Sequence, residues 1–547
     1  GLGSEKTVNK IEVIWPNGKL QTIENITADR SIEIQFDDSS PLASRTKVDN
    51  PLYFEDITES SKIDFLHKED IYNDFAFEPL LPHKNSQLGP ALTVGDINGD
   101  GLEDFFVGNA EGSTAAMYLQ KDNGEFEKLS GPWEKDLDIE DTGALLFDAD
   151  GDSDLDLYVV SGGNNKLRTK VFYQDRLYVN TADGFKKAEK ALPEITSSGL
   201  KVISADYDND GDLDLFVGGR IVPGQYPFPA KSYILRNEGG KDQFIRYVNV
   251  TDEIAPELME AGLVTSALWD DFDQDGKIDL ILTGEWMPIR FFKNLGHRFK
   301  EVTQDLGFGK SQGWWYSLQK MDVDADGDMD YLAGNLGLNY KYRASEKAPF
   351  EVYANDFDEN GSMDIVLSYE KYGTKLPLRG RECSSQQVPA IKQRFKTFES
   401  FANADLKDIY GEKMLDLSLH YAAQNFAHQW IENRGDGTYA MHNLPNRAQF
   451  SSINSIQEID YNGDEYPDAV VAGNLYQSEV ETPRNDSSVG MVLIGGPNGL
   501  ELVAPHESGL IVTGDVRNMA LIKLANNNLN GLLFAINNDS LKLKKVN

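Results

Sequence analysis

Aspartate recurs at a fixed spacing in seven short segments of the chain, and this spacing indicates the chemistry that the chain can perform. Each segment has Asp at its first and ninth positions and Asp or Asn at its third and fifth positions. Oxygen atoms presented at alternate positions of a tight turn suit Ca²⁺, a hard cation that takes about six to eight oxygen ligands in a compliant loop. The segments begin at Asp96, Asp148, Asp206, Asp271, Asp322, Asp356 and Asp460.

The predicted ligands of each loop are the side chains at positions one, three, five and nine, together with the backbone carbonyl at position seven. In chain order they are Asp96, Asn98, Asp100, Leu102 and Asp104; Asp148, Asp150, Asp152, Asp154 and Asp156; Asp206, Asp208, Asp210, Asp212 and Asp214; Asp271, Asp273, Asp275, Lys277 and Asp279; Asp322, Asp324, Asp326, Asp328 and Asp330; Asp356, Asp358, Asn360, Ser362 and Asp364; and Asp460, Asn462, Asp464, Tyr466 and Asp468. We therefore expect up to seven calcium ions, which we interpret as structural. Loops in which Asn replaces Asp carry fewer charges and should bind more weakly.

The residues that follow each loop exclude an EF-hand. An EF-hand needs Glu at loop position twelve and a helix after it. Here position twelve is apolar or small, and the pattern beyond it predicts a β-strand, so the Asp at position nine must close the site. A ligand set made of oxygen alone also argues against zinc and copper.

The repeated loops determine the expected fold. Each lies between two apolar strands, and the first four hairpins are followed by two more strands around a Gly-containing turn, as in DRLYVNTADGFKKA. One unit is thus four antiparallel strands, and the sequence predicts an all-β fold, a seven- or eight-bladed β-propeller. The loop starts are 52, 58, 65, 51, 34 and 104 residues apart, and the spacing of 34 is too short for a full blade.

The sequences at the two ends of the predicted propeller indicate that the ring closes. The last residues read as three strands around a degenerate loop without metal, and YFEDITESS from Tyr53 resembles the fourth strands of earlier units. A strand from residues near Tyr53 that completes the last blade would remove both edges of the ring. We therefore assign the propeller to residues 53–547, with a partly helical insertion at about 372–428.

The first 40 residues predict a separate β segment. KIEVIWPNGKLQTIENI reads as a hairpin around an Asn-Gly turn, SIEIQF reads as a further strand, and residues 41–52 read as a linker.

Composition excludes several classes of function. The chain of 547 residues has 52 basic and 89 acidic residues and a formal charge of -37, so nucleic acid is not an expected partner. One cysteine allows no internal disulfide, and no apolar stretch predicts a transmembrane segment or a signal peptide. The chain has no GxSxG, HExxH or phosphate-loop motif, and no catalytic residue can be assigned. His420 and His428 are spaced so that they could share a helix face, although packing or surface roles are commoner for such a pair.

The repeats resemble FG-GAP or VCBS repeats, the blade type of integrin α-subunit propellers. Residues 1–40, with IEVIWPNGKLQTIENITADRSIEI, look like the tail of an ASPIC/UnbV domain. Segments such as GGRIVPGQYPFPA, GEWMP and GWWYSL are similar to large Bacteroidota surface proteins of this kind. The resemblance implies an extracellular or outer-membrane location and no general catalytic signature.

The connections from the second to the third strand of each unit carry most of the elaboration, and they open on the face opposite the Asp loops. Long loops on a rigid scaffold commonly carry function. We expect ligand contacts on that face from Arg220, Tyr226, Trp286, Trp314, Trp315 and Tyr316, although each aromatic could instead pack between blades. The favoured hypothesis is a calcium-stabilised surface protein that binds or scaffolds a protein or glycan, in an outer-membrane or nutrient-uptake assembly. The alternative is a polysaccharide-active lyase or hydrolase with its site on the same face.

Overall fold

The computed structural model describes residues 6–15, 19–37, 53–165, 167, 169–239, 245–525 and 529–547. The chain forms two compact units, Gly1–Pro51 and Leu52–Asn547, which are described separately. The predicted linker at residues 41–52 lies outside the described residues.

The small unit contains the predicted hairpin. Strands β1 (Thr7–Ile14) and β2 (Leu20–Thr27) pair antiparallel, whereas the turn at residues 16–18 lies outside the described residues. The strand predicted for SIEIQF is wrong, because residues 31–37 form no strand. This segment contacts the hairpin through a side chain instead: the rings of Phe36 and Trp15 meet edge to face, with centroids 5.3 Å apart.

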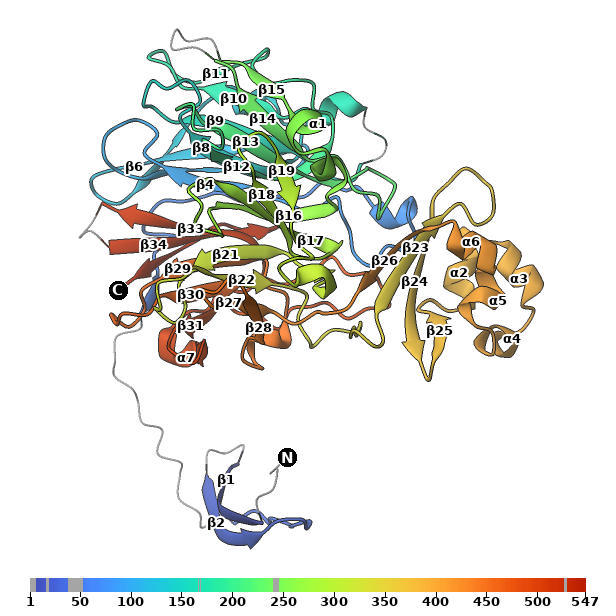
Figure 1. Cartoon of the computed structure of the whole chain (residues 1–547). Helices are drawn as coiled ribbons and strands as arrows, with labels where there is room; N and C mark the ends of the chain where they lie inside the picture. The colour runs from blue at the N-terminus through green and yellow to red at the C-terminus, as the bar shows by residue number, and fades with distance from the viewer. Residues whose placement is uncertain are drawn as a thin grey trace. The chain divides into compact units, whose positions relative to one another are not determined.

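Seven four-stranded antiparallel sheets make up most of the large unit (Figure 1). In each of them the second strand is buried along its length, or nearly so, because neighbouring sheets cover both of its faces. Their strands, from the first of each sheet to the last, are β4 (Leu92–Gly95), β5 (Asp104–Val107), β6 (Ala116–Gln120) and β7 (Phe126–Leu129); β8 (Asp141–Phe147), β9 (Asp156–Ser161), β10 (Arg176–Val179) and β11 (Lys186–Lys187); β12 (Ser198–Ala205), β13 (Asp214–Ile221), β14 (Tyr233–Asn237) and β15 (Tyr247–Asn249); β16 (Leu263–Asp270), β17 (Asp279–Met287), β18 (Arg290–Asn294) and β19 (Phe299–Glu301), with β20 (Gly313–Trp314) also paired to β17; β21 (Ser317–Met321), β22 (Asp330–Gly334), β27 (Gln429–Asn433) and β28 (Tyr439–Asn443); β29 (Ser455–Ile459), β30 (Asp468–Ala472), β31 (Met491–Ile494) and β32 (Glu501–Val503); and β33 (Asp515–Leu524), β34 (Leu529–Asn537), β35 (Lys542–Val546) and β3 (Phe54–Asp56).

The first strands of these sheets form a closed cycle. Each contacts the first strand of the next sheet, in the order β4, β8, β12, β16, β21, β29, β33, and β33 contacts β4 again. Such a cycle is the geometry of a β-propeller, so the predicted all-β fold is confirmed. The sequence predicted seven or eight blades, and the cycle of contacts runs through seven sheets.

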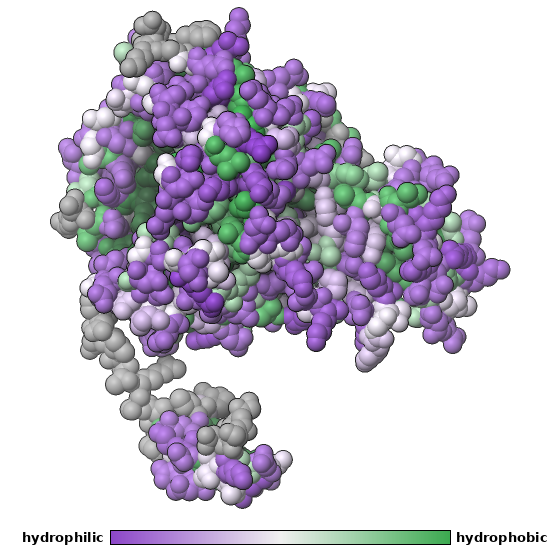
Figure 2. Space-filling view, viewed as in Figure 1, coloured by the Kyte–Doolittle hydropathy of each residue, from purple (hydrophilic) through white to green (hydrophobic). Residues whose placement is uncertain are grey.

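The apolar cores lie between neighbouring sheets. Phe216 and Ile234 of the third sheet, for example, pack against Val264 and Leu282 of the fourth. The face shown in Figure 2 is mainly hydrophilic, with apolar patches between polar regions.

An eighth sheet lies outside the cycle and corrects the predicted insertion. It consists of β23 (Phe350–Asn355), β24 (Asp364–Lys371), β25 (Thr374–Pro377) and β26 (Leu419–Ala423), in the order β25-β24-β23-β26. It therefore begins at Phe350 and not near residue 372, and the sixth Asp loop belongs to it. The reason is long-range pairing: β22 pairs with β27 from beyond the insertion, which leaves the β23–β24 hairpin to form a sheet of its own.

Five short helices accompany this inserted sheet, as the sequence predicted, and together they stand beside the ring (Figure 1, gold). They are α2 (Arg381–Gln387), α3 (Ala390–Arg394), α4 (Phe398–Ala402), α5 (Leu406–Tyr410) and α6 (Glu412–Asp416). Two further helices are α1 (Thr251–Ile254), after the third sheet, and α7 (Pro505–Ser508), after β32.

The closing strand β3 pairs with β35, and the predicted ring closure is thereby confirmed. The register places Phe54 opposite Val546 and Asp56 opposite Lys544, whose ammonium lies 3.0 Å from the Asp56 carboxylate. Phe54 is buried among residues of the sixth and seventh sheets, including Val470 and Phe534. One short strand from near the start of the large unit thus joins its two ends.

Removal of the Phe54 side chain tests this closure. We expect Phe54→Ala to lower the free energy of unfolding by about 3–5 kcal/mol, because it leaves a cavity between two sheets. Amide hydrogen exchange in β35 should accelerate as well. Glu55→Ala is the control, since Glu55 lies on the same strand and is exposed. Equal stability of the two variants would show that β3 does not hold the ring closed.

Candidate metal centre

The Asp-rich loops connect the first and second strands of six ring sheets, and the sixth loop connects β23 and β24 of the inserted sheet. In antiparallel sheets the turns between strands one and two emerge at the end opposite to those between strands two and three. The loops of the six ring sheets therefore share one face of the ring. The loop at Asp356 is set apart from them in the inserted sheet, which corrects the expectation that all seven belong to the ring.

The acidic side chains of each loop shape the turn that carries them. In the third loop, Asp206 accepts hydrogen bonds from the backbone N–H groups of Asp210 and Gly211, both at 3.1 Å, and Asp210 accepts one from Asp212 at 3.2 Å. The fourth, fifth and sixth loops repeat this pattern. In the third and fifth loops the turn thus holds the carboxylates at positions one and five with remaining oxygen lone pairs for a cation. In the fourth loop Asp275 also pairs with Lys277 and Lys293, and in the sixth loop position five is Asn360.

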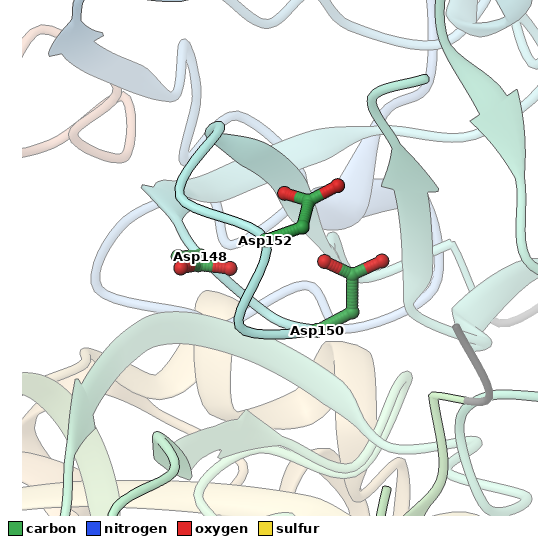
Figure 3. A group of neighbouring side chains, drawn as sticks. All are labelled: Asp148, Asp150 and Asp152. Carbon is green, nitrogen blue, oxygen red and sulfur yellow. The ribbon is translucent and has the colours of Figure 1, made fainter. Parts of the chain in front are cut away.

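Carboxylate oxygens from a single loop come together in five of the loops. In each of these, three carboxylates have oxygen atoms within 4.8 Å of one another. Figure 3 shows one such group, with Asp148, Asp150 and Asp152 arranged around their turn. The groups are Asp148, Asp150 and Asp152; Asp206, Asp208 and Asp210; Asp271, Asp273 and Asp279; Asp322, Asp324 and Asp330; and Asp356, Asp358 and Asp364.

The Asp at position nine begins the second strand and is buried in all seven loops. One oxygen of Asp214 accepts a hydrogen bond from the backbone N–H of Asn237, at 2.8 Å, and Asp279 accepts one from Asn294, at 2.7 Å. This carboxylate therefore ties the loop to the third strand of its own sheet. The other oxygens of Asp214 and Asp279 are buried and have no hydrogen-bond partner in the described structure.

Unpartnered buried oxygens also occur at position three. Asp150, Asp208, Asp324 and Asp358 each have one. Buried polar atoms normally have a partner, because an unpaired one costs about 1–3 kcal/mol. A hard cation at the centre of each loop would satisfy these oxygens, so the residues present fit calcium.

The protonation equilibria of the loops point in the same direction. Burial raises the pKa of Asp214 to about 8, and the charges of Asp208 and Asp212 add to the effect. Burial likewise raises the pKa of Asp279 to about 7, with contributions from Asp273 and Asp275. A bound divalent cation supplies the opposite charge and favours the ionised carboxylates.

The loops that carry Asn at position three differ from the others. The Nδ2 of Asn98 donates a hydrogen bond to Asp100, and that of Asn462 donates one to Asp464, at 2.9 and 2.6 Å. Within the residues described, neither of these loops gathers three acidic side chains. We expect these two loops to bind a cation more weakly. We expect the same of the sixth loop, which has Asn360 at position five but does gather three carboxylates.

An asparagine at the end of the third strand is a feature that our sequence analysis missed. The Nδ2 of Asn180 donates to the carbonyl of Ile97 (2.9 Å), that of Asn237 to Ala149 (3.0 Å), and that of Asn294 to Tyr207 (2.8 Å). Each bond joins one sheet to the Asp loop of the preceding sheet. The sequence signal was present, because the third strands end in LYVN, ILRN and FFKN.

The residues predicted to contact a ligand are placed differently from our expectation. Arg220, Tyr226, Trp286, Trp314 and Trp315 are buried, at most 3 % exposed, and Tyr316 is largely buried. They do not form an exposed aromatic surface. The alternative, that they pack between sheets, describes their positions.

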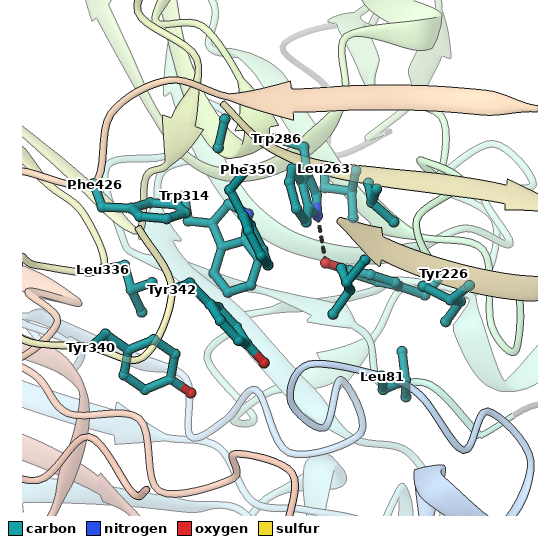
Figure 4. Close-up of a cluster of buried hydrophobic side chains, with 14 of the residues drawn as sticks. Leu81, Tyr226, Leu263, Trp286, Trp314, Leu336, Tyr340, Tyr342, Phe350 and Phe426 are labelled. Atoms are coloured by element: carbon teal, nitrogen blue, oxygen red, sulfur yellow. Dashed lines mark hydrogen bonds between the residues drawn. The ribbon is translucent and has the colours of Figure 1, made fainter. Parts of the chain in front are cut away.

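Three of these aromatic side chains belong to one core cluster (Figure 4). Trp286 and Trp314 pack against each other and against Phe350 of the inserted sheet, which covers them. The indole N–H of Trp286 donates a hydrogen bond to the hydroxyl of Tyr226, drawn as a dashed line in Figure 4.

A buried ionic network lies beside this cluster. Arg220 forms an ion pair with Glu285, which also accepts hydrogen bonds from Tyr226 and from His83, the latter at 3.0 Å. Burial opposes the charge of Glu285, but His83 and Arg220 hold its pKa at about 2. Arg220 and Tyr226 therefore help to join the third and fourth sheets.

The two histidines near the insertion do not share a helix. His420 lies on β26 and its Nε2 is 2.9 Å from the Glu351 carboxylate. His428 is buried before β27, where it accepts a hydrogen bond from the N–H of Asn335 and donates one to the carbonyl of Ser451. Both histidines have structural partners.

Comparisons with known proteins agree with the repeats and with the N-terminal segment. A model of the FG-GAP-like repeat matches residues 96–159, 148–217 and 271–333, and a model described as ASPIC and UnbV matches residues 1–41. Cartilage acidic protein 1 is 28 % identical in Xenopus tropicalis over 209 residues and 28 % identical in Homo sapiens over 210 residues. These matches cover 38 % of this chain and 30 % of each relative, so the chain spans less than a third of the relatives' length.

Solved structures similar to the chain include two whose similarity is distant. They are the Vibrio cholerae biofilm matrix protein Bap1, with 9 % identity, a TM-score of 0.36 and 91 % of both chains covered, and the Dos1 propeller, with 11 % identity, a TM-score of 0.34 and coverage of 88 % of this chain and 96 % of that one. The ring of four-stranded sheets, the Asp loops and the two matched family models together identify the chain as a β-propeller protein with FG-GAP-like repeats and an ASPIC and UnbV segment.

Proposed function

We propose that this chain is a calcium-stabilised extracellular protein that binds or scaffolds a protein partner through the face opposite its Asp loops. The partner would belong to an outer-membrane or nutrient-uptake assembly. One observation carries the proposal: the exposed large apolar side chains of the described large unit, except Met329, lie in the connections that open on that face or in the insertion.

The positions of these side chains follow from the connections that hold them. Connections from strand two to strand three, and from strand four to the first strand of the next sheet, open opposite the Asp loops. All the large apolar side chains recorded as exposed in the described large unit, except Met329, lie in such connections or in the insertion. They are Leu66, Ile71, Leu137, Leu167, Val171, Leu338, Tyr372, Phe398, Leu417, Phe450, Val480 and Ile511.

Aliphatic side chains dominate this set, and Ile71 and Val480 are fully exposed. Exposed apolar side chains that gather on one face favour a contact with another protein. A sugar ring is recognised mainly by exposed aromatic side chains, and the Trp residues predicted for that role are buried. We therefore favour a protein partner over a glycan, and binding over the alternative of a polysaccharide-active enzyme.

The extracellular location rests on the metal chemistry and on the resemblance to surface proteins. Calcium sites in extracellular modules bind with dissociation constants of about 10⁻⁴–10⁻³ M. Loops with Asn at position three suit such an environment, because they carry fewer charges. In the described part of the chain, no helix is both long enough and apolar enough to span a membrane.

Calcium removal tests the structural role of the loops. We expect a chelator to lower the melting temperature of the protein, because each site filled at one hundred times its Kd contributes about 2.7 kcal/mol. Asp214→Asn should reduce the gain in stability on addition of calcium without lowering stability in chelator, since it removes a buried charge. Asp122→Asn, an exposed carboxylate in the turn between β6 and β7, is the control. Identical melting curves with and without calcium would contradict a structural metal.

Substitutions on the apolar face test the partner. The full chain is purified in calcium from cells that produce it, and the amount of co-purified partner is measured. We expect Ile71→Asp combined with Val480→Asp to reduce that amount at least tenfold, because two charges would be buried at the contact. Lys128→Asp, on the outer strand β7, should leave it unchanged. If all variants that keep their melting temperature recover the same amount of partner, this face is not the site of the contact.

A further inference from the structure

A cavity of about 330 Å³ lies on the axis of the ring. All seven first strands, β4, β8, β12, β16, β21, β29 and β33, contribute side chains to its wall. Its volume is in the range of small-molecule sites, which begin at about 300 Å³. The cavity is distinct from the Asp loops and from the apolar face.

The segment that precedes β4 crosses one end of this cavity. The Nε2 of His83 lies 3.0 Å from the carboxylate of Glu285 in the fourth sheet, and the N–H of Lys84 donates to the carbonyl of Gln477, beyond the second strand of the sixth sheet. His83 and Lys84 therefore lie at the wall of the cavity as well as on this bridge. This bridge closes one end of the axial cavity.

The charge of the wall is opposite to that of the protein. Lys84, Lys201, Arg220, Arg517 and His83 line the cavity, and none of its lining residues, all of which are described, is acidic. The whole chain has a formal charge of -37 and 89 acidic against 52 basic residues. The wall of the cavity is therefore basic, although the chain as a whole is strongly acidic.

Several polar groups of this wall lack a partner in the described structure. The ammonium group of Lys201 forms neither a hydrogen bond nor an ion pair there, and burial lowers the pKa of Lys201. The Nε and Nη1 atoms of Arg220 and the hydroxyl of Tyr316 are buried without a partner. Burial and the charge of Glu285 raise the pKa of Tyr316, whereas Arg220 and Arg517 act in the opposite direction. These groups are donors, so an anion would satisfy them.

Carboxylates outside the wall compensate only part of this charge. Arg220 pairs with Glu285, and Arg517 pairs with Asp515 at 2.9 Å. Glu69 interacts with Lys84 and Arg517, and burial raises the pKa of Glu69 to about 8. Among the basic side chains of the wall, the ammonium groups of Lys84 and Lys201 form no ion pair in the described chain.

We propose that the axial cavity binds a small dianion, an organic dicarboxylate or a tetrahedral oxyanion, with Lys201 as its principal charged contact. Two ammonium groups match two negative charges, and Tyr316 and Arg220 supply further donors. The cavity is too small for a macromolecule, and it would give this propeller a small-molecule site in addition to its protein contact.

Titration with sulfate and with succinate tests the proposal and separates the two chemical classes. Calcium is kept saturating, ionic strength is held constant with chloride, and binding is measured by calorimetry and by the shift in melting temperature. We expect saturable binding of one probe at about one site per chain. Lys201→Met should weaken it at least tenfold, whereas Lys128→Met, on an outer strand, should not change it.

Lys201→Met removes an unpaired buried charge, so we expect it to fold and to melt at or above the temperature of the unsubstituted protein. Binding of neither probe would overturn the proposal. Equal binding by Lys201→Met and the unsubstituted protein would overturn it as well, because the anion would then lie outside the axial cavity.

Discussion

The buried carboxylate at position nine of each Asp loop is the interaction on which the rest of the structure depends. It begins the second strand in every loop, and in the six ring sheets it accepts a hydrogen bond from the end of the third strand, as Asp214 does from Asn237. Burial of an ionised group is costly unless a partner of opposite charge is present. Calcium at each loop would therefore stabilise a sheet at the place where three of its segments meet.

The Asp loops also take part in contacts between neighbouring sheets. In the second, third and fourth sheets, the asparagine at the end of the third strand donates to the loop of the preceding sheet, so a cation that fixed that loop would also hold the neighbouring sheet. The ring is closed by β3, which precedes the first sheet in the chain and pairs with β35 of the last sheet. Cation binding in the loops would therefore act together with the contacts between sheets and with ring closure to stabilise the propeller.

Local and repeated features could be predicted from the sequence, whereas long-range pairing could not. The hairpins, the position-nine Asp and the strand at Tyr53 were predicted because each repeats a pattern within a few residues. The partner of β22 could not be read locally, since β27 lies beyond the insertion, and the Asp356 hairpin therefore resembled one more blade. Trp286 and Trp314 suggested a surface because they follow elaborated loops, but the inserted sheet covers them.

The most direct test of calcium in the loops is diffraction from crystals grown in calcium, with anomalous data collected at a wavelength where calcium scatters anomalously. The account predicts anomalous peaks inside the Asp loops, bounded by the oxygens of positions one, three, five and nine, and strongest in the five loops that gather three carboxylates. Well-ordered loops with no anomalous peak, at a calcium concentration that leaves the melting temperature at its maximum, would contradict it.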